Sequence, residues 1–298
     1  MSAAERPTLG FIGPGTVGTA LARSFANADY TVAAIYGRDP KRRSRAAESV
    51  PGAVAADSAQ AVVDAADLVF LTVPDDAIRA VAESLAWKSG TAVVHCSGAA
   101  SVDLLDAAAD TGASVGAFHP LQTLAGVDQA MRNLPGSAVA IEASDLAFEE
   151  RLAEMARALG GRPFALRGDK ALYHASAVLA CNDLVTLLDA AASLWSELGL
   201  SKDEGLRALL PLVRGTIENL DAIGLPNALT GPVARGDVGT VDRNLIALDA
   251  ASPETADLYR ALARRTIPIA RAKGTLSEAA ADRLCERLDS GPRTSERQ

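Results

Sequence analysis

The sequence predicts an α/β fold with a mostly parallel sheet, followed by an all-α region. In the first part of the chain, short apolar runs alternate with amphipathic helical patterns, which is typical of parallel strands joined by crossover helices. From Lys170 to about Leu288 only helical periodicity remains. We therefore expect a first domain over residues 1–167, a helical domain over 168–290 and a disordered tail over 291–298.

Each expected strand is a short, largely apolar run bounded by turn-forming residues. The strands are expected at residues 8–12, 30–36, 67–74, 91–98, 114–120, 138–141 and 160–166. Helices are expected at residues 145–159, 171–198, 202–222, 238–250, 253–272 and 277–289. The segment 171–198 is long and largely apolar, which favours a buried central helix that also packs against a partner subunit.

A glycine-rich turn directly follows the first expected strand. Residues 13–18 match the pattern G-x-G-x-x-G, and the residues after them have the apolar spacing of a helix. A buried strand, a tight turn and a helix N-terminus together form the pyrophosphate site of a Rossmann-like domain. The alternative is an ordinary structural turn without a ligand. We expect the motif residues to bind a dinucleotide: Gly13, Pro14, Gly15, Thr16, Val17 and Gly18.

The end of the second expected strand indicates which dinucleotide binds. An Asp or Glu usually ends this strand in NAD-binding domains, whereas Tyr36 is followed here by Gly37 and Arg38. We expect Arg38 to pair with the 2′-phosphate of NADP(H), with Arg42 adding to the positive field. Asp39 also fits the N-cap of the next helix, so these charged residues can be read simply as the solvated start of that helix. The two interpretations are compatible.

Composition and charge exclude several classes of function. The net charge of −8 and the pI of about 5.0 disfavour nucleic-acid binding. Cys96, Cys181 and Cys285 have no metal-binding spacing and are expected to be reduced thiols in a cytoplasmic protein. We expect no metal, no signal peptide and no apolar run of transmembrane length, and hence no membrane partner.

Polar residues at the ends of the later strands are candidates for the reaction site. Ligands of open α/β sheets bind beyond the carboxyl ends of the strands, so we expect Val73, Pro74 and Ser97 to line the nicotinamide half of a cofactor. His119 at the next strand end suits a proton or hydrogen-bond donor to a substrate carbonyl. Its alternative role is to cap backbone groups in a His-Pro turn. His95, inside an apolar strand, is interpreted as a satisfied buried histidine.

The first turns of the helical domain carry a dense polar cluster. Lys170, Tyr173 and His174 share one face of the expected helix, and Asn182 lies beside the continuation of that stripe. Polar groups that open an otherwise apolar helix are costly to bury, so we expect Lys170 and His174 to be catalytic and Tyr173 and Asn182 to bind substrate. The alternative is a solvated helix start.

A loop rich in turn formers, residues 225–237, offers a further substrate contact. Thr230 and Arg235 suit an acidic substrate group, because arginine binds carboxylates well. An interhelical loop in which Arg235 pairs with Asp237 is the alternative.

The order of these motifs resembles the two-domain reductases that include 6-phosphogluconate dehydrogenase, ketopantoate reductase and pyrroline-5-carboxylate reductase. It is most similar to the branch with a Rossmann-like first domain and a helical second domain of long-unknown function. Three segments carry that resemblance: residues 119–123, 173–177 and 229–237. It implies that Lys170 matches a lysine acid/base. His174 stands where the relatives have an amide, a departure that leaves the substrate open.

The resemblance implies an NADPH-dependent oxidoreductase that reduces a small carbonyl compound, a 2-oxo acid such as ketopantoate. Lys170 or His119 would protonate the product, while His174, Asn182 and Arg235 orient the substrate. One alternative is an imine reductase of the pyrroline-carboxylate type, and another is a noncatalytic NADP(H)-binding regulator. A homodimer formed through the helical domain is expected.

Overall fold

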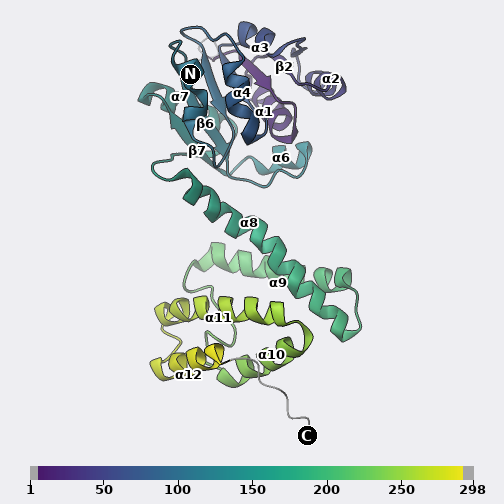
Figure 1. Cartoon of the computed structure of the whole chain (residues 1–298), viewed down its shortest axis with the longest axis vertical. Coiled ribbons are helices and arrows are strands. Elements are labelled where there is room, and N and C mark those ends of the chain that lie inside the picture. Colours follow the sequence, from purple (N-terminus) through teal and green to yellow (C-terminus); the bar gives the residue numbers. More distant parts are fainter. Residues whose placement is uncertain (1–5, 291–298) are drawn as a thin grey trace. The chain divides into compact units, whose positions relative to one another are not determined.

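The computed structural model describes residues 6–290, so the tail expected over 291–298 lies outside the described residues. The chain divides into two compact units, Met1–Cys181 and Asn182–Gln298, and each is described by itself. The first unit is the mixed α/β part, and the second is helical (Figure 1).

The first unit contains an eight-stranded sheet in the order β3-β2-β1-β4-β5-β6-β7-β8. The strands are β1 (Leu9–Ile12), β2 (Val32–Tyr36), β3 (Val54–Ala55), β4 (Leu68–Leu71), β5 (Ala92–His95), β6 (Ser114–Pro120), β7 (Ala138–Ala143) and β8 (Arg162–Ala165). β6 and β7 run antiparallel, and the other neighbouring pairs are parallel. The prediction of a mostly parallel sheet followed by helices is confirmed.

Helices cover both faces of this sheet, which explains why its central strands are apolar on both sides. They are α1 (Thr16–Asn27), α2 (Pro40–Glu48), α3 (Ala59–Ala65), α4 (Ile78–Glu83), α5 (Asp106–Ala109), α6 (Val127–Asn133) and α7 (Leu146–Ala158), with short 3₁₀ turns η2 (Asp75–Ala77) and η3 (Val102–Leu105). One core contains Phe11 and Phe70, whose rings stack with centroids 4.9 Å apart, together with residues of α1 and α7. The other contains Val69 and Leu71, which pack against α3 and α4.

Helix α8 (Lys170–Ser193) begins in the first unit and ends in the second, because the units divide between Cys181 and Asn182. The strand pattern ends with β8, close to the boundary expected near residue 167. The division by contacts falls further along, within α8. The placement of the domain boundary therefore stays a prediction.

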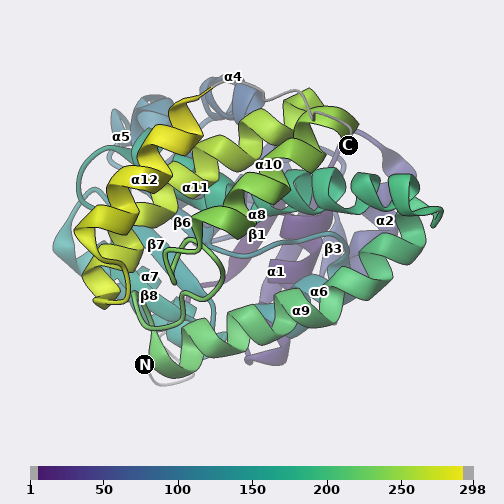
Figure 2. The same ribbon diagram turned by 90° about the horizontal axis from the view of Figure 1, so that it is seen from below.

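Within the second unit, α10 (Val238–Ala251), α11 (Pro253–Lys273) and α12 (Glu278–Asp289) pack together (Figure 2). Their shared core includes Val241, Leu245, Ile267 and Leu284. The other elements of this unit are η4 (Leu194–Leu198) and α9 (Lys202–Ile223). Ser201 and Glu204 form a capping box at the start of α9, which satisfies two backbone N–H groups there.

Two ion pairs are built into this helical core. Arg260 Nη2 lies 2.6 and 2.7 Å from the two carboxylate oxygens of Asp249, and both side chains are only 8% exposed. Arg287 Nε pairs with one carboxylate oxygen of Asp242 between α12 and α10, and these side chains are 4% and 29% exposed. Arg260 also contacts Asp257, whose side chain is 82% exposed.

The expectation that residues 171–198 form a buried central helix is wrong. In the most apolar 18-residue window of Lys170–Leu198 only 6% of the residues are buried. Leu172, Leu179 and Val185 are each more than two-thirds exposed. This segment is also long and apolar enough to cross a membrane by length and composition alone, which corrects the expectation that no apolar run reaches that length. The sequence pattern did signal an apolar surface, but it did not show what covers it.

Substituting Asp249 by Ala is expected to destabilise the helical unit by about 3 kcal/mol, because the Arg260 charge would lose its buried partner and keep only the exposed Asp257. Asp257→Ala is the matched control: it removes an exposed carboxylate from the same arginine and is expected to cost much less. Urea unfolding followed by circular dichroism measures both. Equal losses for the two variants would contradict a dominant role of the buried pair.

Candidate functional site

A cavity of about 930 Å³ lies at the glycine motif, entirely within the first unit. Its walls come from the β1–α1 turn, the ends of β2 and β4, and α4. It is lined by seven of the residues expected to bind cofactor: Gly13, Pro14, Gly15, Arg38, Arg42, Val73 and Pro74. Thr16, Val17 and Gly18 form the first turn of α1.

Glycine is required at two motif positions because the backbone passes close to Thr72. Gly13 has a φ of 110°, and a Cβ there would lie 2.6 Å from the Thr72 carbonyl group. A Cβ on Gly18 would lie 2.3 Å from both the Gly13 carbonyl oxygen and Thr72 Oγ1. The Thr72 hydroxyl donates to that same carbonyl at 2.7 Å. These contacts hold the start of α1 against the end of β4.

The N-terminus of α1 is suited to an anion. Gly15 is its N-cap and has no side chain to cap the first-turn N–H groups. The position of a Cβ on Gly15 meets no atom within 4 Å, so the backbone is open to a ligand at this point. Uncapped N–H groups and the positive end of the helix dipole both favour phosphate here.

The residues after β2 can both cap the next helix and supply positive charge to the cavity. The Asp39 carboxylate accepts hydrogen bonds from the backbone N–H groups of Lys41 and Arg42, and so caps α2. Its Oδ1 is thereby engaged at the helix start. Arg38 and Arg42 line the cavity at the same place, so the positive charge expected for a 2′-phosphate is present.

A second cluster joins the end of β6 to the start of α8. The His119 Nδ1 atom lies 2.8 Å from the Tyr173 hydroxyl, and the two rings meet edge to face. The ring of His174 lies 6.4 Å from that of His119, centroid to centroid. A Cβ on Gly98 would lie 2.8 Å from both His119 Nε2 and His174 Nδ1. Glycine at position 98 therefore lets both imidazoles approach the β5 loop closely.

Lys170 is held by a carboxylate that sequence reasoning missed. Its Nζ lies 2.9 Å from Glu142 Oε2, and the two side chains are 8% and 21% exposed. Glu142 stands in β7 opposite Ala117 of the antiparallel strand β6. The available signal was an acidic residue within the otherwise apolar strand Ala138–Ala143.

Burial keeps the aromatic groups of this cluster neutral. Desolvation lowers the pKa of His119 to about 4, with smaller contributions from the charges of His174 and Lys170. Desolvation raises the pKa of Tyr173 to about 12. At neutral pH the pair is therefore an uncharged imidazole beside an uncharged phenol.

Ser97 and His95 organise the loop after β5. The Ser97 hydroxyl donates to the Asp75 carboxylate at 2.6 Å and accepts from the backbone N–H groups of Ala99 and Ala100. Its expected contact with a cofactor stays a prediction, because this hydroxyl is already engaged in the loop. His95 is fully buried and its Nδ1 accepts from the Ser97 N–H at 3.2 Å. Burial lowers its pKa to about 4.

Residues 2–120 match the family described as Rossmann-like domain, and residues 137–266 match the domain of unknown function DUF2520. The chain combines a Rossmann-like domain with a DUF2520 domain. This confirms the resemblance seen in the sequence. A comparison with curated proteins finds no match.

Several solved structures share this fold at low identity. One described as an NADP oxidoreductase from Bacteroides fragilis is 23% identical, with a TM-score of 0.69 over 89% of this chain and 99% of that one. A reductive aminase from Aspergillus terreus in complex with NADPH and ethyl levulinate is 17% identical, with a TM-score of 0.62 over 94% and 99%. A 1-pyrroline-5-carboxylate reductase from Streptococcus pyogenes is 18% identical, with a TM-score of 0.60 over 90% and 99%.

The second cluster is assembled from both matched families. His119 lies in the Rossmann-like match, whereas Glu142, Lys170, Tyr173 and His174 lie in the DUF2520 match. The DUF2520 match begins at residue 137, so it includes the last two strands of the sheet as well as α8. The cluster therefore combines residues from the two segments of the chain that match these families.

The remaining predicted substrate residues lie in the second unit. Asn182, Thr230 and Arg235 are exposed there, and their role stays a prediction. The Asp237 carboxylate caps α10 by accepting from the Thr240 N–H at 2.9 Å. Among the described residues it forms no ion pair with Arg235, contrary to the alternative considered for this loop.

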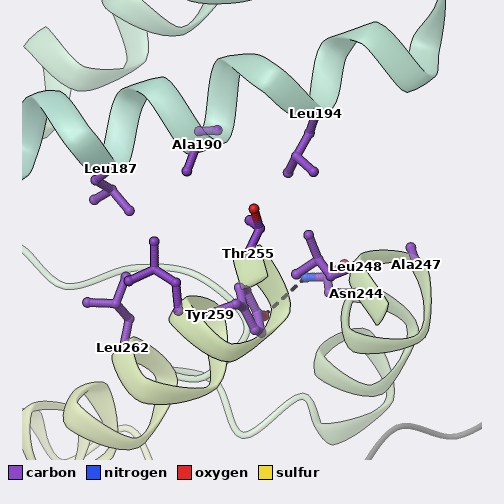
Figure 3. A pocket seen from close by; sticks show the side chains of 11 residues that line it. Leu187, Ala190, Leu194, Asn244, Ala247, Leu248, Thr255, Tyr259 and Leu262 are labelled. Atoms are coloured by element: carbon purple, nitrogen blue, oxygen red, sulfur yellow. Dashed lines mark hydrogen bonds between the residues drawn. The ribbon is translucent and has the colours of Figure 1, made fainter. Parts of the chain in front are cut away.

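The DUF2520 region holds a second cavity, of about 390 Å³, between α8, α10 and α11. Leu187 and Ala190 project into it from α8, and Leu194 projects into it from η4 (Figure 3). On the opposite wall, Asn244 donates to the Tyr259 hydroxyl at 3.2 Å. The lining is otherwise mostly apolar.

The imidazole signals of His95 and His119 are expected to titrate near pH 4 by NMR, because burial disfavours their charged forms. The pKa in the unfolded chain is 6.5, so the unfolded state binds more protons between pH 4 and 6.5. Stability is therefore expected to fall as the pH drops through this window. A titration midpoint near 6.5 for either imidazole would contradict the burial described for it.

Proposed function

We propose that this protein is an NADP(H)-dependent oxidoreductase that reduces a small carbonyl compound, with a 2-oxo acid such as ketopantoate as the first candidate. The observation that carries the proposal is the glycine-lined cavity with Arg38 and Arg42 at one end. The structural neighbours include an NADP oxidoreductase and NADPH-bound aminases, which point to the same cofactor.

The cavity residues fit a dinucleotide in shape and charge. The open backbone at Gly15 and the uncapped start of α1 would hold the pyrophosphate. Arg38 would pair with the 2′-phosphate in a charge-assisted contact, and Arg42 would add to the field. Val73 and Pro74, at the end of β4, would line the nicotinamide half. The bound cofactor would supply the hydride.

The protein would supply the proton and the orientation of the substrate. His119 and Lys170 are the two candidates for the proton donor: His119 lies at the end of β6, where ligands of open sheets bind, and Lys170 belongs to the same cluster at the start of α8. His174 would orient the substrate from the same cluster. Asn182 and Arg235 would help to orient the substrate, and Thr230 and Arg235 would bind its acidic group.

Reduction of a C=N bond is the second candidate reaction. It is favoured by the neighbours described as imine reductases, a reductive aminase and a pyrroline-5-carboxylate reductase. A cyclic imine carrying a carboxylate would need the same groups from the site as a 2-oxo acid: a cation for the carboxylate and a proton donor. The two reactions differ in the electrophile, and both need the same cofactor.

Purified protein is expected to oxidise NADPH when offered a panel of 2-oxo acids and cyclic imines, ketopantoate and pyrroline-5-carboxylate among them. Replacing Arg38 by Ala is expected to raise KM for NADPH roughly tenfold to a hundredfold, at about 1–3 kcal/mol for a charge-assisted contact. KM for NADH should change little. The absorbance of NADPH follows both reactions.

Lys41→Ala is the matched control for Arg38→Ala, because Lys41 is a cation at the same helix start that does not line the cavity. It should leave KM for NADPH near the wild-type value. NADPH binding without turnover on the whole panel would favour the noncatalytic regulator instead. Failure to bind NADPH by calorimetry would overturn the proposal itself.

We propose further that two copies of the chain associate through the helical region, in a cytoplasmic protein with no nucleic-acid or membrane partner. The apolar face of α8 is too extensive to be left in water at no cost. Exposed large apolar side chains continue on α9, and the cavity beside α8 offers a recess for a partner side chain. The exposed apolar side chains are Val185 and Leu187 on α8, and Leu212, Ile217, Leu220 and Ile223 on α9.

Light scattering coupled to gel filtration is expected to give about twice the chain mass of 30.7 kDa. The double variant Val185→Arg/Leu212→Arg should shift the protein to monomer, since it places charges in the apolar surface. Leu146→Arg is the control: it changes an equally exposed leucine, 77% exposed, in α7 of the first unit. A monomeric wild type would contradict the dimer, and binding to lipid vesicles would assign the apolar helix to a membrane.

A further inference from the structure

We infer that Tyr173 and His119 form a proton relay, in which the Tyr173 hydroxyl donates to His119 Nδ1 and His119 Nε2–H delivers the proton to the substrate. In this arrangement Lys170 is a positioning residue. The inference rests on the proposed reductase function and names the proton donor that the sequence left open between Lys170 and His119.

The hydrogen bond between the two side chains defines the relay. His119 Nδ1 and the Tyr173 hydroxyl oxygen are 2.8 Å apart, with the rings edge to face at 88°. A phenol is the better donor and a neutral imidazole nitrogen the better acceptor of the two, so the tyrosine proton points at Nδ1. The ring N–H of a neutral imidazole is then on Nε2.

The surroundings of His119 Nε2 suit a substrate oxygen. Nε2 lies against Gly98, where any side chain would collide with it, and His174 Nδ1 lies equally close to the same position. His174 Nδ1 is buried and has no hydrogen-bond partner within residues 6–290. A buried nitrogen without a partner is costly. Because both nitrogens lie close to the same point at Gly98, a substrate oxygen that accepts from His119 Nε2 would come near this second imidazole as well.

Lys170 is poorly placed to give up a proton. Its ammonium forms a buried ion pair with Glu142, and removing its proton would leave the carboxylate without a charge partner. Its charge instead favours neutral histidines: it lowers the pKa of both His119 and His95, after the larger effect of burial. The other charged or titratable groups that act on His119 are His174 and Asp75.

The proton and electron balance of the step is simple. Hydride adds to the carbonyl carbon, the π pair of the C=O bond forms a bond to the His119 Nε2 proton, and the carbonyl is reduced to an alcohol as the nicotinamide is oxidised. His119 Nδ1 takes the Tyr173 proton at the same time, so no imidazolium accumulates. Afterwards Nδ1 returns its proton to the half-buried Tyr173 phenolate and Nε2 takes one from water, which restores the starting tautomer.

Tyr173→Phe tests the relay, because it keeps the ring and removes only the hydroxyl. It is expected to lower kcat about a hundredfold, the lower range for loss of general acid catalysis, with the Kd for NADPH unchanged. Tyr30→Phe makes the same chemical change in the core of the first unit and should keep the wild-type kcat. Lys170→Arg, which preserves the charge and the pair with Glu142, should lower kcat less than Tyr173→Phe.

A second measurement is independent of turnover. In ¹⁵N NMR spectra, His119 of the wild type is expected in the Nε2–H tautomer, and Tyr173→Phe should shift it toward a mixture of tautomers. An Nδ1–H tautomer in the wild type would overturn the relay even if no substrate is turned over. Wild-type turnover that survives in Tyr173→Phe would overturn it while leaving the reductase function intact.

Discussion

The close approach of α1 to the end of β4 is the constraint on which the proposed cofactor site depends. It requires a backbone turn at Gly13, the absence of a side chain at Gly18 and the hydroxyl of Thr72 bonded to the Gly13 carbonyl. Together they leave the first-turn N–H groups of α1 uncapped beside an open backbone. A single methyl group at Gly13 or Gly18 would separate the two elements and remove the anion site that they form.

The reaction end of the proposed site depends on a different feature, the reversal of strand direction at β7. Because β7 runs antiparallel to β6, Glu142 stands opposite Ala117, two residues before His119. The carboxylate can therefore reach Lys170 at the start of α8. A wholly parallel sheet would have carried a residue near the end of β7 in the opposite direction. The reversal thus brings a half-buried carboxylate into a cluster that otherwise contains only nitrogen and phenol groups.

Much of the fold could be predicted from the sequence because its signals are local. Residues that are neighbours in the sequence determine the apolar runs, the glycine turn and the Asp39 cap. Each of these was placed correctly to within a few positions. The partners Asp75 and Glu142 could not be found in this way. Each bonds to a residue more than twenty positions away, and only the folded sheet brings them together.

The expected burial of α8 failed for a related reason. Periodicity measures how apolar a helix is, but it does not show which surface covers it. The helix is apolar all round, which in a soluble protein indicates burial, yet in a single chain most of it is exposed. The proposed dimer would cover this exposed apolar surface.

The charges around His119 explain how a weak acid could serve as the donor. A protonated imidazole in this position would face the Lys170 ammonium, which is fixed by Glu142, and would also lose most of its hydration. Both effects favour the neutral ring, so a donor that first stores a proton as imidazolium is disfavoured. A relay through Tyr173 avoids this charge, since one proton leaves the ring as another arrives. The buried lysine would then act by disfavouring the charged state of its neighbour His119, so its positive charge would matter more than its own proton.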